Sequence, residues 1–440
     1  MSHHHTAASQ HETVFTYAAP ALKFGRGAAT EIGYDVRGWG ARRVLLVTDP
    51  GVAAVGHAAR VADGLASYEL AVTVFDRARV EPTDQSLIEA VEFARSEGPF
   101  DAVVAVGGGS AIDTAKAVAL LVTNPGELMD YVNAPVGKAR APEQPVLPLV
   151  AVPTTTGTGS ESTTICVMDV LALKVKTGIS HAALRPRLAV VDPSLSATQP
   201  GGVTAAAGMD ILCHALESYT ARWYADYPAK RPEQRVPYCG SNPIADLWSE
   251  RALGLLAGAF RDAVRGEDPA AAEQMALAAT FAGLGFGNAG VHIPHACAYP
   301  IAGRVRGFRP GGYPDHEHGE TLAVADGAEP IVPHGMAVAL TAPAAFRFTF
   351  DAAPQRHLAA ARLLDPSASG DDADVLPGVL TDLMGDIGIP NGLGAIGYGE
   401  SDVDDLVAGA LQQQRLLATA PKEVTADDVA GIIAASMEHR

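Results

Sequence analysis

The chain has 440 residues, of which 48% are hydrophobic, and its formal net charge is −18 at pH 7. This length is enough for two domains, each with a core of its own. The acidic balance, with no compensating basic stripe, argues against a nucleic-acid partner. The sequence contains no uninterrupted apolar stretch of about 18 residues, the length that would predict a membrane span. We therefore expect a cytoplasmic protein that contacts neither nucleic acid nor membrane.

The pattern of elements changes along the chain. Residues 1–14 have no apolar core and no arginine-rich amphipathic pattern, which indicates a disordered end rather than a targeting signal. Over residues 15–199, short apolar strands alternate with alanine-rich helical stretches, which predicts a parallel sheet flanked by helices. Helical stretches dominate residues 200–440, apart from a charged insert at 303–332. We predict an α/β nucleotide-binding domain followed by an all-helical domain, with the chemistry in the cleft between them.

A glycine cluster follows the apolar strand at 101–106. The glycines at 107–109 and Ser110 stand between this strand and a predicted helix over 111–122. Glycines let a backbone approach a phosphate closely, and the first turn of a helix offers free N–H donors. The segment therefore suits a pyrophosphate, with Ser110 and Asp113 as a capping pair for the helix. Because the spacing is not that of the dinucleotide fingerprint, an ordinary tight turn is the alternative.

Two further segments favour a nucleotide. The strand at 149–152 leads into a threonine- and glycine-rich loop at 153–161, which could line a nicotinamide pocket or merely cap a helix. The strand at 44–48 ends in Asp49. A carboxylate in that place can accept hydrogen bonds from a ribose hydroxyl and repels a 2′-phosphate, which favours NAD over NADP.

Three segments of the second half suit a catalytic metal. Asp210 and His214 stand four residues apart in a helical stretch, so both side chains project from one face. His295 and His334 lie in two separate segments further along. One carboxylate and three imidazoles suit Fe²⁺ or Zn²⁺. Alone, the Asp210–His214 pair is more often a helix charge beside a satisfied histidine, but the nucleotide segments upstream favour a metal site.

In this order, and over nearly the whole chain, these motifs resemble the iron-containing alcohol dehydrogenase family. The resemblance implies a dehydroquinate synthase-like architecture, with NAD and Fe²⁺ (or Zn²⁺) as cofactors, and we expect a homodimer. It also implies roles for single residues. The metal ligands would be Asp210, His214, His295 and His334, and the cofactor-binding residues would be Asp49, Gly107, Gly108, Gly109, Ser110, Asp113, Thr154, Thr155, Thr158 and Lys176.

Within the family, the stretches 173–176, 214–220, 240–248 and 281–292 look most like the hydroxyacid-oxoacid transhydrogenase branch. That branch passes a hydride from 4-hydroxybutyrate to 2-oxoglutarate through a nicotinamide that stays bound, giving succinate semialdehyde and 2-hydroxyglutarate. The alternatives are an ordinary NAD-dependent alcohol dehydrogenase and a maleylacetate reductase. A dehydroquinate synthase-like lyase is more remote, because it would need a phosphate-binding set of basic residues that we do not identify.

The sequence departs from the simpler alcohol dehydrogenases next to one predicted ligand. Four residues after the equivalent of His295 those enzymes commonly carry a second histidine, assigned to proton handling, where this chain has Tyr299. Tyr299 and His292 are therefore the candidates for acid–base catalysis. Side chains that merely pack in the core are the alternative for both.

The insert is the second departure. It carries Arg304, Arg306 and Arg309, followed by an acidic stretch. Arginine forks bind carboxylates through two hydrogen bonds, so these side chains could clamp a dicarboxylate substrate. A solvated surface loop is the alternative, and we expect His316 and His318 of this loop to bind nothing structural.

Overall fold

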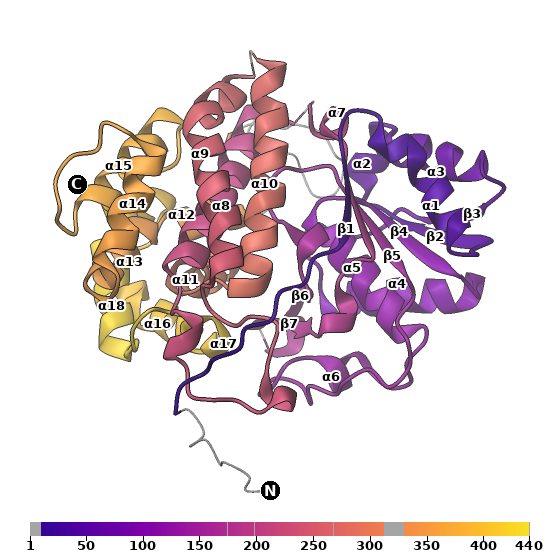
Figure 1. Cartoon of the computed structure of the whole chain (residues 1–440), viewed down its shortest axis with the longest axis horizontal. Helices are drawn as coiled ribbons and strands as arrows, with labels where there is room; N and C mark the ends of the chain where they lie inside the picture. Colours follow the sequence, from indigo (N-terminus) through magenta and orange to yellow (C-terminus); the bar gives the residue numbers. More distant parts are fainter. Residues whose placement is uncertain (1–9, 174, 198, 267, 312–329, 440) are drawn as a thin grey trace, which may run out of the picture.

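The computed structural model describes residues 10–173, 175–197, 199–266, 268–311 and 330–439. An α/β part and a helical part lie side by side (Figure 1). The α/β part holds a six-stranded sheet in which every neighbouring pair is parallel. The predicted fold class is confirmed. In spatial order the strands are β1 (Ala21–Phe24), β8 (Leu188–Val191), β5 (Leu149–Pro153), β4 (Ala102–Gly107), β2 (Arg43–Val47) and β3 (Ala71–Phe75).

The central strand β4 is buried on both faces of the sheet, and its side chains enter two separate cores. One core takes side chains from α4 (Asp84–Glu97) and α5 (Gly109–Leu121). The other takes side chains from α1 (Ile32–Gly38) and α3 (His57–Ala66). A strand covered on both faces needs apolar residues at every position, which explains the continuous apolar run in the sequence.

Two features of the α/β part were not predicted from the sequence. The first is β1, an edge strand that pairs with β8. The second is an antiparallel hairpin outside the main sheet, formed by β6 (Ile165–Val170) and β7 (Val175–Ser180). The remaining short helices of this part are α2 (Pro50–Ala54), α6 (Leu128–Tyr131) and α7 (Pro193–Ser196).

The helical part is built around α8 (Gly201–Thr220), which is buried along most of its length. It packs against α9 (Pro243–Arg265), α10 (Pro269–Ala289) and α12 (His334–Ala339). Among the described residues no single helix is long and apolar enough to cross a membrane, and α10 with the next helix reaches that length only across a 105° bend. The other helices are α11 (Ile293–Gly303), α13 (Ala342–Thr349), α14 (Pro354–Leu364), α15 (Val375–Asp386), α16 (Val403–Leu411), α17 (Gln414–Leu417) and α18 (Ala426–Ala435).

The first described residues form a strap, residues 10–24, that runs along the helical part and ends as β1 in the sheet (Figure 1). Glu12 is buried there, its backbone N–H donates to Tyr227 O at 2.8 Å, and its carboxylate pairs with Arg235 at 3.0 Å. Residues 10–14 thus differ from the disordered end that the sequence predicts. Residues 1–9 of that end, and 312–329 of the insert with His316 and His318, lie outside the described residues.

Candidate functional site

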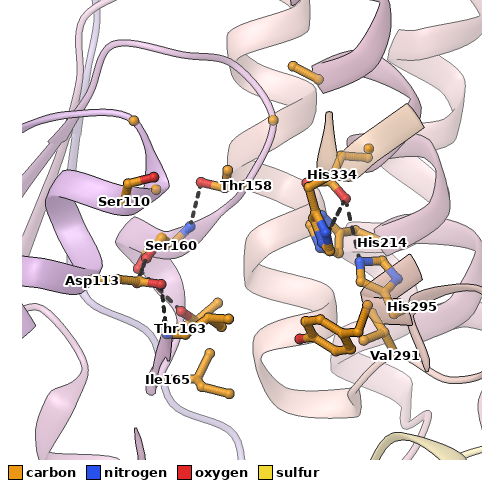
Figure 2. A pocket seen from close by; sticks show the side chains of 18 of the residues that line it. Ser110, Asp113, Thr158, Ser160, Thr163, Ile165, His214, Val291, His295 and His334 are labelled. Carbon is orange, nitrogen blue, oxygen red and sulfur yellow. Dashed lines mark hydrogen bonds and ion pairs between the residues drawn. The ribbon is translucent and has the colours of Figure 1, made fainter. Parts of the chain in front are cut away.

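A cavity of about 280 Å³ lies where the carboxyl ends of the sheet strands meet the helical part. Parallel sheets bind ligands at this edge, because the strands end there and the following loops are free to vary. Figure 2 shows small polar side chains of the α/β part facing imidazoles of the helical part across the cavity. The labelled polar residues on the first side are Ser110, Asp113, Thr158, Ser160 and Thr163, and those on the second are His214, His295 and His334.

The glycine cluster brings two loops of the α/β part into close contact. A Cβ at Gly108 would lie 3.2 Å from Thr155 Oγ1, and a Cβ at Gly109 would lie 2.9 Å from Thr158 Oγ1. A side chain at Gly109 therefore has no room, and one at Gly108 would be crowded. Gly108 is the N-cap of α5 and no side chain caps this helix start, so its N–H groups remain available to a phosphate.

The predicted capping pair is wrong. Ser110 Oγ donates to Val80 O at 3.1 Å, while Asp113 accepts from Ser160 Oγ at 2.6 Å and from the backbone of Val167 at 2.9 Å. The reason is Lys116, which is fully buried one turn later and lies 3.2 Å from Asp113. A buried ammonium needs a carboxylate partner, so Asp113 is directed towards Lys116 instead of the helix start.

Three predicted cofactor residues do not line this cavity. Asp49 caps α2, with its Oδ1 accepting from Val52 N at 2.9 Å, and burial raises the pKa of Asp49. Thr154 donates its backbone N–H to Gly107 O at 3.0 Å. Asp49, Gly107 and Thr154 lie at the carboxyl ends of the sheet strands but outside the cavity wall. Their contacts with a nucleotide therefore stay a prediction. The predicted residues that do line it are Gly108, Gly109, Ser110, Asp113, Thr155, Thr158 and Lys176.

The four predicted metal ligands surround one point in the cavity. Asp210 Oδ1 lies 3.7 Å from His214 Nε2, 3.4 Å from His295 Nε2 and 3.8 Å from His334 Nε2. Ligand atoms of Asp210, His295 and His334 lie within 4.8 Å of one another. Asp210 Oδ1 and His295 Nε2 are buried without a hydrogen-bond partner. Buried polar atoms that lack partners and converge in this way fit a divalent cation.

Electrostatics favours a cation at the same point. Burial lowers the pKa of His214 to about 3, so its imidazole is neutral and free to bind a metal. Burial opposes ionisation of Asp210, but its interactions with His214, His334 and His295 outweigh burial and hold its pKa well below the ordinary range. Burial also disfavours the charged form of His295, yet Glu217 and Asp210 outweigh it and raise that pKa to about 9. The buried carboxylates of Asp210 and Glu217 thus supply negative charge that would stabilise a bound cation.

Glu217 holds His295 in place, a role that the sequence analysis missed. His295 Nδ1 lies 2.6 Å from Glu217 Oε1, and the backbone N–H of His292 donates to the other carboxylate oxygen at 2.5 Å. A carboxylate on Nδ1 fixes the ring and leaves Nε2 as the ligand atom. The signal was present, because Glu217 follows His214 by three residues and lies on the same helical face.

The two acid–base candidates lie in different surroundings. Tyr299 lines the cavity, and its ring centroid is 6.0 Å from that of His334. Burial raises the pKa of the Tyr299 hydroxyl, so this group keeps its proton near neutral pH. His292 is fully buried, does not line the cavity, and places its Nε2 3.1 Å from Thr220 Oγ1. A direct role for His292 in proton transfer is therefore not supported.

The arginines of the insert do not reach the cavity as expected. Arg304 pairs with Asp405 at 2.8 Å and Arg306 pairs with Asp402 at 2.9 Å. Both line a separate surface groove beside Tyr398. The carboxylate clamp is therefore wrong for these two residues, while Arg309 is buried. Ser160 of the predicted 153–161 loop lines the cavity, and the sequence analysis gave no role to six other residues that do so: Glu81, Thr163, Tyr238, Phe286, Arg415 and Thr419.

Comparison with known families covers both parts of the chain. The family described as iron-containing alcohol dehydrogenase matches residues 19–193. The C-terminal part of the Fe-containing alcohol dehydrogenase family matches residues 233–325 and 315–437.

Curated relatives match nearly the full length. The mitochondrial hydroxyacid-oxoacid transhydrogenase of Rattus norvegicus is 42% identical over 433 residues, which cover 96% of this chain and 90% of the relative. The enzyme of the same name from Homo sapiens is 42% identical over 434 residues, with the same coverage. The expectation of a cytoplasmic enzyme is wrong in the light of these relatives, because they are named as mitochondrial proteins.

Solved structures share the fold. A 1,3-propanediol oxidoreductase has a TM-score of 0.81 at 29% identity, over 96% of this chain and 100% of the other. Sulfoacetaldehyde reductase from Bifidobacterium kashiwanohense, solved with NAD⁺, has a TM-score of 0.76 at 28% identity, over 96% and 98%. The family matches, the full-length relatives and the cluster of one carboxylate and three imidazoles agree, and this chain belongs to the iron-containing alcohol dehydrogenase family of oxidoreductases.

Proposed function

We propose that this protein is a hydroxyacid-oxoacid transhydrogenase. One observation carries the proposal. Asp210, His214, His295 and His334, here called the Asp210 cluster, face Gly108 and Gly109 of the α/β part across one cavity. A hydride can pass between a substrate and a nicotinamide only if both lie in one space. The full-length relatives with this name support the substrate class, 4-hydroxybutyrate and 2-oxoglutarate.

Asp210, His214, His295 and His334 would hold Fe²⁺, or Zn²⁺, whose chemistry here is to stabilise negative charge on a substrate oxygen. Asp210 Oδ1 and His295 Nε2, which are buried without a hydrogen-bond partner, support this assignment. Tyr299, at the cavity wall beside His334, is the proposed proton carrier.

NAD would lie along the α/β side, with its pyrophosphate at the start of α5, whose first N–H groups no side chain caps. Thr155 and Thr158 border the same place. We assign residues 15–199 to NAD binding and 200–440 to catalysis. A homodimer is proposed as well, since β1 is an edge strand and its Leu22 is exposed; light scattering of the purified protein tests it.

The reaction has two halves that balance. In the first, the C–H bond at C4 of 4-hydroxybutyrate breaks, the hydride goes to NAD⁺ and the hydroxyl proton leaves. In the second, the same hydride goes to C2 of 2-oxoglutarate and a proton returns to the keto oxygen. The cofactor ends as it began, so it need not leave the protein between the halves.

The test mixes the metal-loaded protein with 4-hydroxybutyrate and 2-oxoglutarate without added NAD. We expect 2-hydroxyglutarate and succinate semialdehyde to accumulate in equal amounts over many turnovers. The matched variant His295→Ala should lose metal and turnover but keep its affinity for NAD, because the two sites lie in different parts of the chain. Product that appears only in proportion to added NAD would identify an ordinary dehydrogenase and overturn the proposal.

A further inference from the structure

Arg415 is a solvent-exposed cation at the cavity wall that pairs with no carboxylate among the described residues. The cavity is lined by two permanent cations, Lys176 and Arg415. The ammonium of Lys176 is matched by Glu81 at 2.5 Å and Asp169 at 3.1 Å. No ion pair or hydrogen bond joins the Arg415 side chain to any other residue that the structure describes. A guanidinium left in this way beside a substrate cavity attracts an anionic group of the ligand.

The orientation of Arg415 suits a carboxylate. Its Cζ lies over the ring of Tyr238, 5.0 Å from the centroid. Tyr238 is itself buried, and its hydroxyl lies 3.4 Å from Thr164 Oγ1. A guanidinium that rests its face on an aromatic ring keeps the N–H groups at its edge free, and those groups match the two oxygens of a carboxylate.

The segment that carries Arg415 is fixed at both ends. Before it, Gln413 Nε2 donates to Lys176 O of β7 at 3.3 Å. After it, Thr419 Oγ1 donates to Val291 O at 2.5 Å. Figure 1 shows α17 between α16 and β7, beneath α11. Arg415 therefore lines the same cavity as the Asp210 cluster at a position set by both parts of the chain.

The two substrates of the proposed reaction share one spacing. In 4-hydroxybutyrate two methylene groups separate the reacting carbon from the carboxylate carbon. In 2-oxoglutarate two methylene groups likewise separate the keto carbon from the distal carboxylate. One cation at a fixed distance from the metal-binding cluster can therefore hold both molecules with the reacting carbon at the same point. The second carboxylate of 2-oxoglutarate adjoins the keto carbon and so stays on the side of the cluster.

We propose that Arg415 binds the carboxylate that both substrates have in common and so selects carboxylated alcohols over uncharged ones. The inference rests on the proposed function, since it names the group that recognises the substrates of that reaction. Arg415 takes the carboxylate-binding role that the sequence suggested for Arg304 and Arg306, whose charges are paired with aspartates outside the cavity.

The test compares the parent with Arg415→Gln, Arg415→Lys and the matched control Arg304→Gln. We expect Arg415→Gln to lower kcat/KM for 4-hydroxybutyrate and for 2-oxoglutarate on the order of 10- to 100-fold, mainly through KM. Oxidation of 1-butanol, which has the same carbon chain without the charge, should be unchanged. Arg415→Lys should recover part of the loss, because lysine keeps the charge and loses the fork. Arg304→Gln should match the parent.

Three results overturn the inference and leave the proposed function in place: an Arg415→Gln variant that handles both acids like the parent, an equal loss with 1-butanol, or a weakened affinity for NAD, which would assign Arg415 to the cofactor. A parent that does not transfer hydride between the two acids overturns the proposed function instead. In that case calorimetry measures the affinity of the NAD-loaded parent and of Arg415→Gln for 4-hydroxybutyrate. Equal affinities would show that Arg415 does not bind the carboxylate.

Discussion

Glu217 joins two segments that meet at Asp210, His214, His295 and His334, the proposed metal ligands. Its carboxylate accepts from the backbone of His292 and from Nδ1 of His295. It is fully buried, and burial opposes its ionisation, yet the charge of His295 lowers its pKa. The orientation of His295 thus depends on a charged group that would not itself touch the metal.

We predict that Glu217→Gln weakens metal binding by about 10- to 100-fold. Glutamine has the same size, but its amide nitrogen is a donor and would meet a second donor at either His292 N or His295 Nδ1. The measurement is metal affinity by competition with a chelator. Glu250→Gln, at an exposed site on α9, is the control, and equal affinity in all three proteins would show that His295 is held by packing alone.

Single residues also show what the sequence could reveal. Asp210 and His214 could be predicted because helical spacing places them on one face, and the structure brings both to the cluster. Asp113 was misplaced because the buried Lys116 competes for it, and burial of a lysine has no signature in the sequence. Arg415 was missed because it approaches the cavity only through tertiary packing of a short helix.

At the scale of elements, the start of α12 lies unusually close to α8. A Cβ at Gly335 would be 2.1 Å from Ala206 O and 2.7 Å from Asp210 Cβ. This close approach brings His334 beside Asp210. Gly335 is therefore needed so that α12 can contact α8, and not because its backbone conformation requires a glycine.

Gly335→Ala should therefore move α12 away from α8 and cost about 1–3 kcal/mol of unfolding free energy, with loss of bound metal. The matched control is Gly258→Ala on α9, where a Cβ would meet nothing within 4 Å. That change should stabilise the protein by up to about 1 kcal/mol, since alanine favours a helix. Thermal unfolding and metal content are measured for both, and a fully metal-loaded Gly335→Ala protein of parental stability would contradict the close approach.

The strands that the sequence reveals are those with uninterrupted apolar runs. The strands β2, β3, β4, β5 and β8 could be expected from their apolar runs. The strand β1 and the hairpin β6–β7 could not, because a charged residue interrupts the apolar run in each strand: Lys23, Asp169 and Lys176. The hairpin matters to the site all the same, since it carries Lys176 to the cavity.

At the scale of the whole molecule, the strap links the two parts of the chain. Glu12 anchors it to the helical part, Ala18 exchanges hydrogen bonds with Asn288 of α10 at 3.0 and 3.1 Å, and β1 then enters the sheet. The hydrogen bond from Arg235 lowers the pKa of Glu12 from its ordinary value of 4.5 to about 2.

Glu12→Gln should destabilise the protein at pH 7 by about 1–3 kcal/mol, because a charge-assisted network is lost. A lowered folded-state pKa means that the stabilisation is complete above pH 4.5 and disappears as the pH falls towards 2. Urea unfolding of parent and variant at pH 7 and pH 3 measures this. The gap, which is the difference between their free energies of unfolding, should narrow at pH 3. Glu31→Gln, which removes an exposed ion pair with Lys23, is the control; a gap independent of pH would exclude the Glu12 charge as its source.

The strap is one of several ties across the boundary between the two parts. Arg185 donates to Gly287 O at 3.3 Å, and Gln413 donates to Lys176 O at the same distance. Parting the two sides breaks all of these together, so we expect release of a large molecule held between them to be slow compared with exchange of a four- or five-carbon acid. In kinetic terms we expect a ping-pong order, in which the first acid leaves before the second arrives and a nicotinamide that has not been released keeps the electrons in the interval.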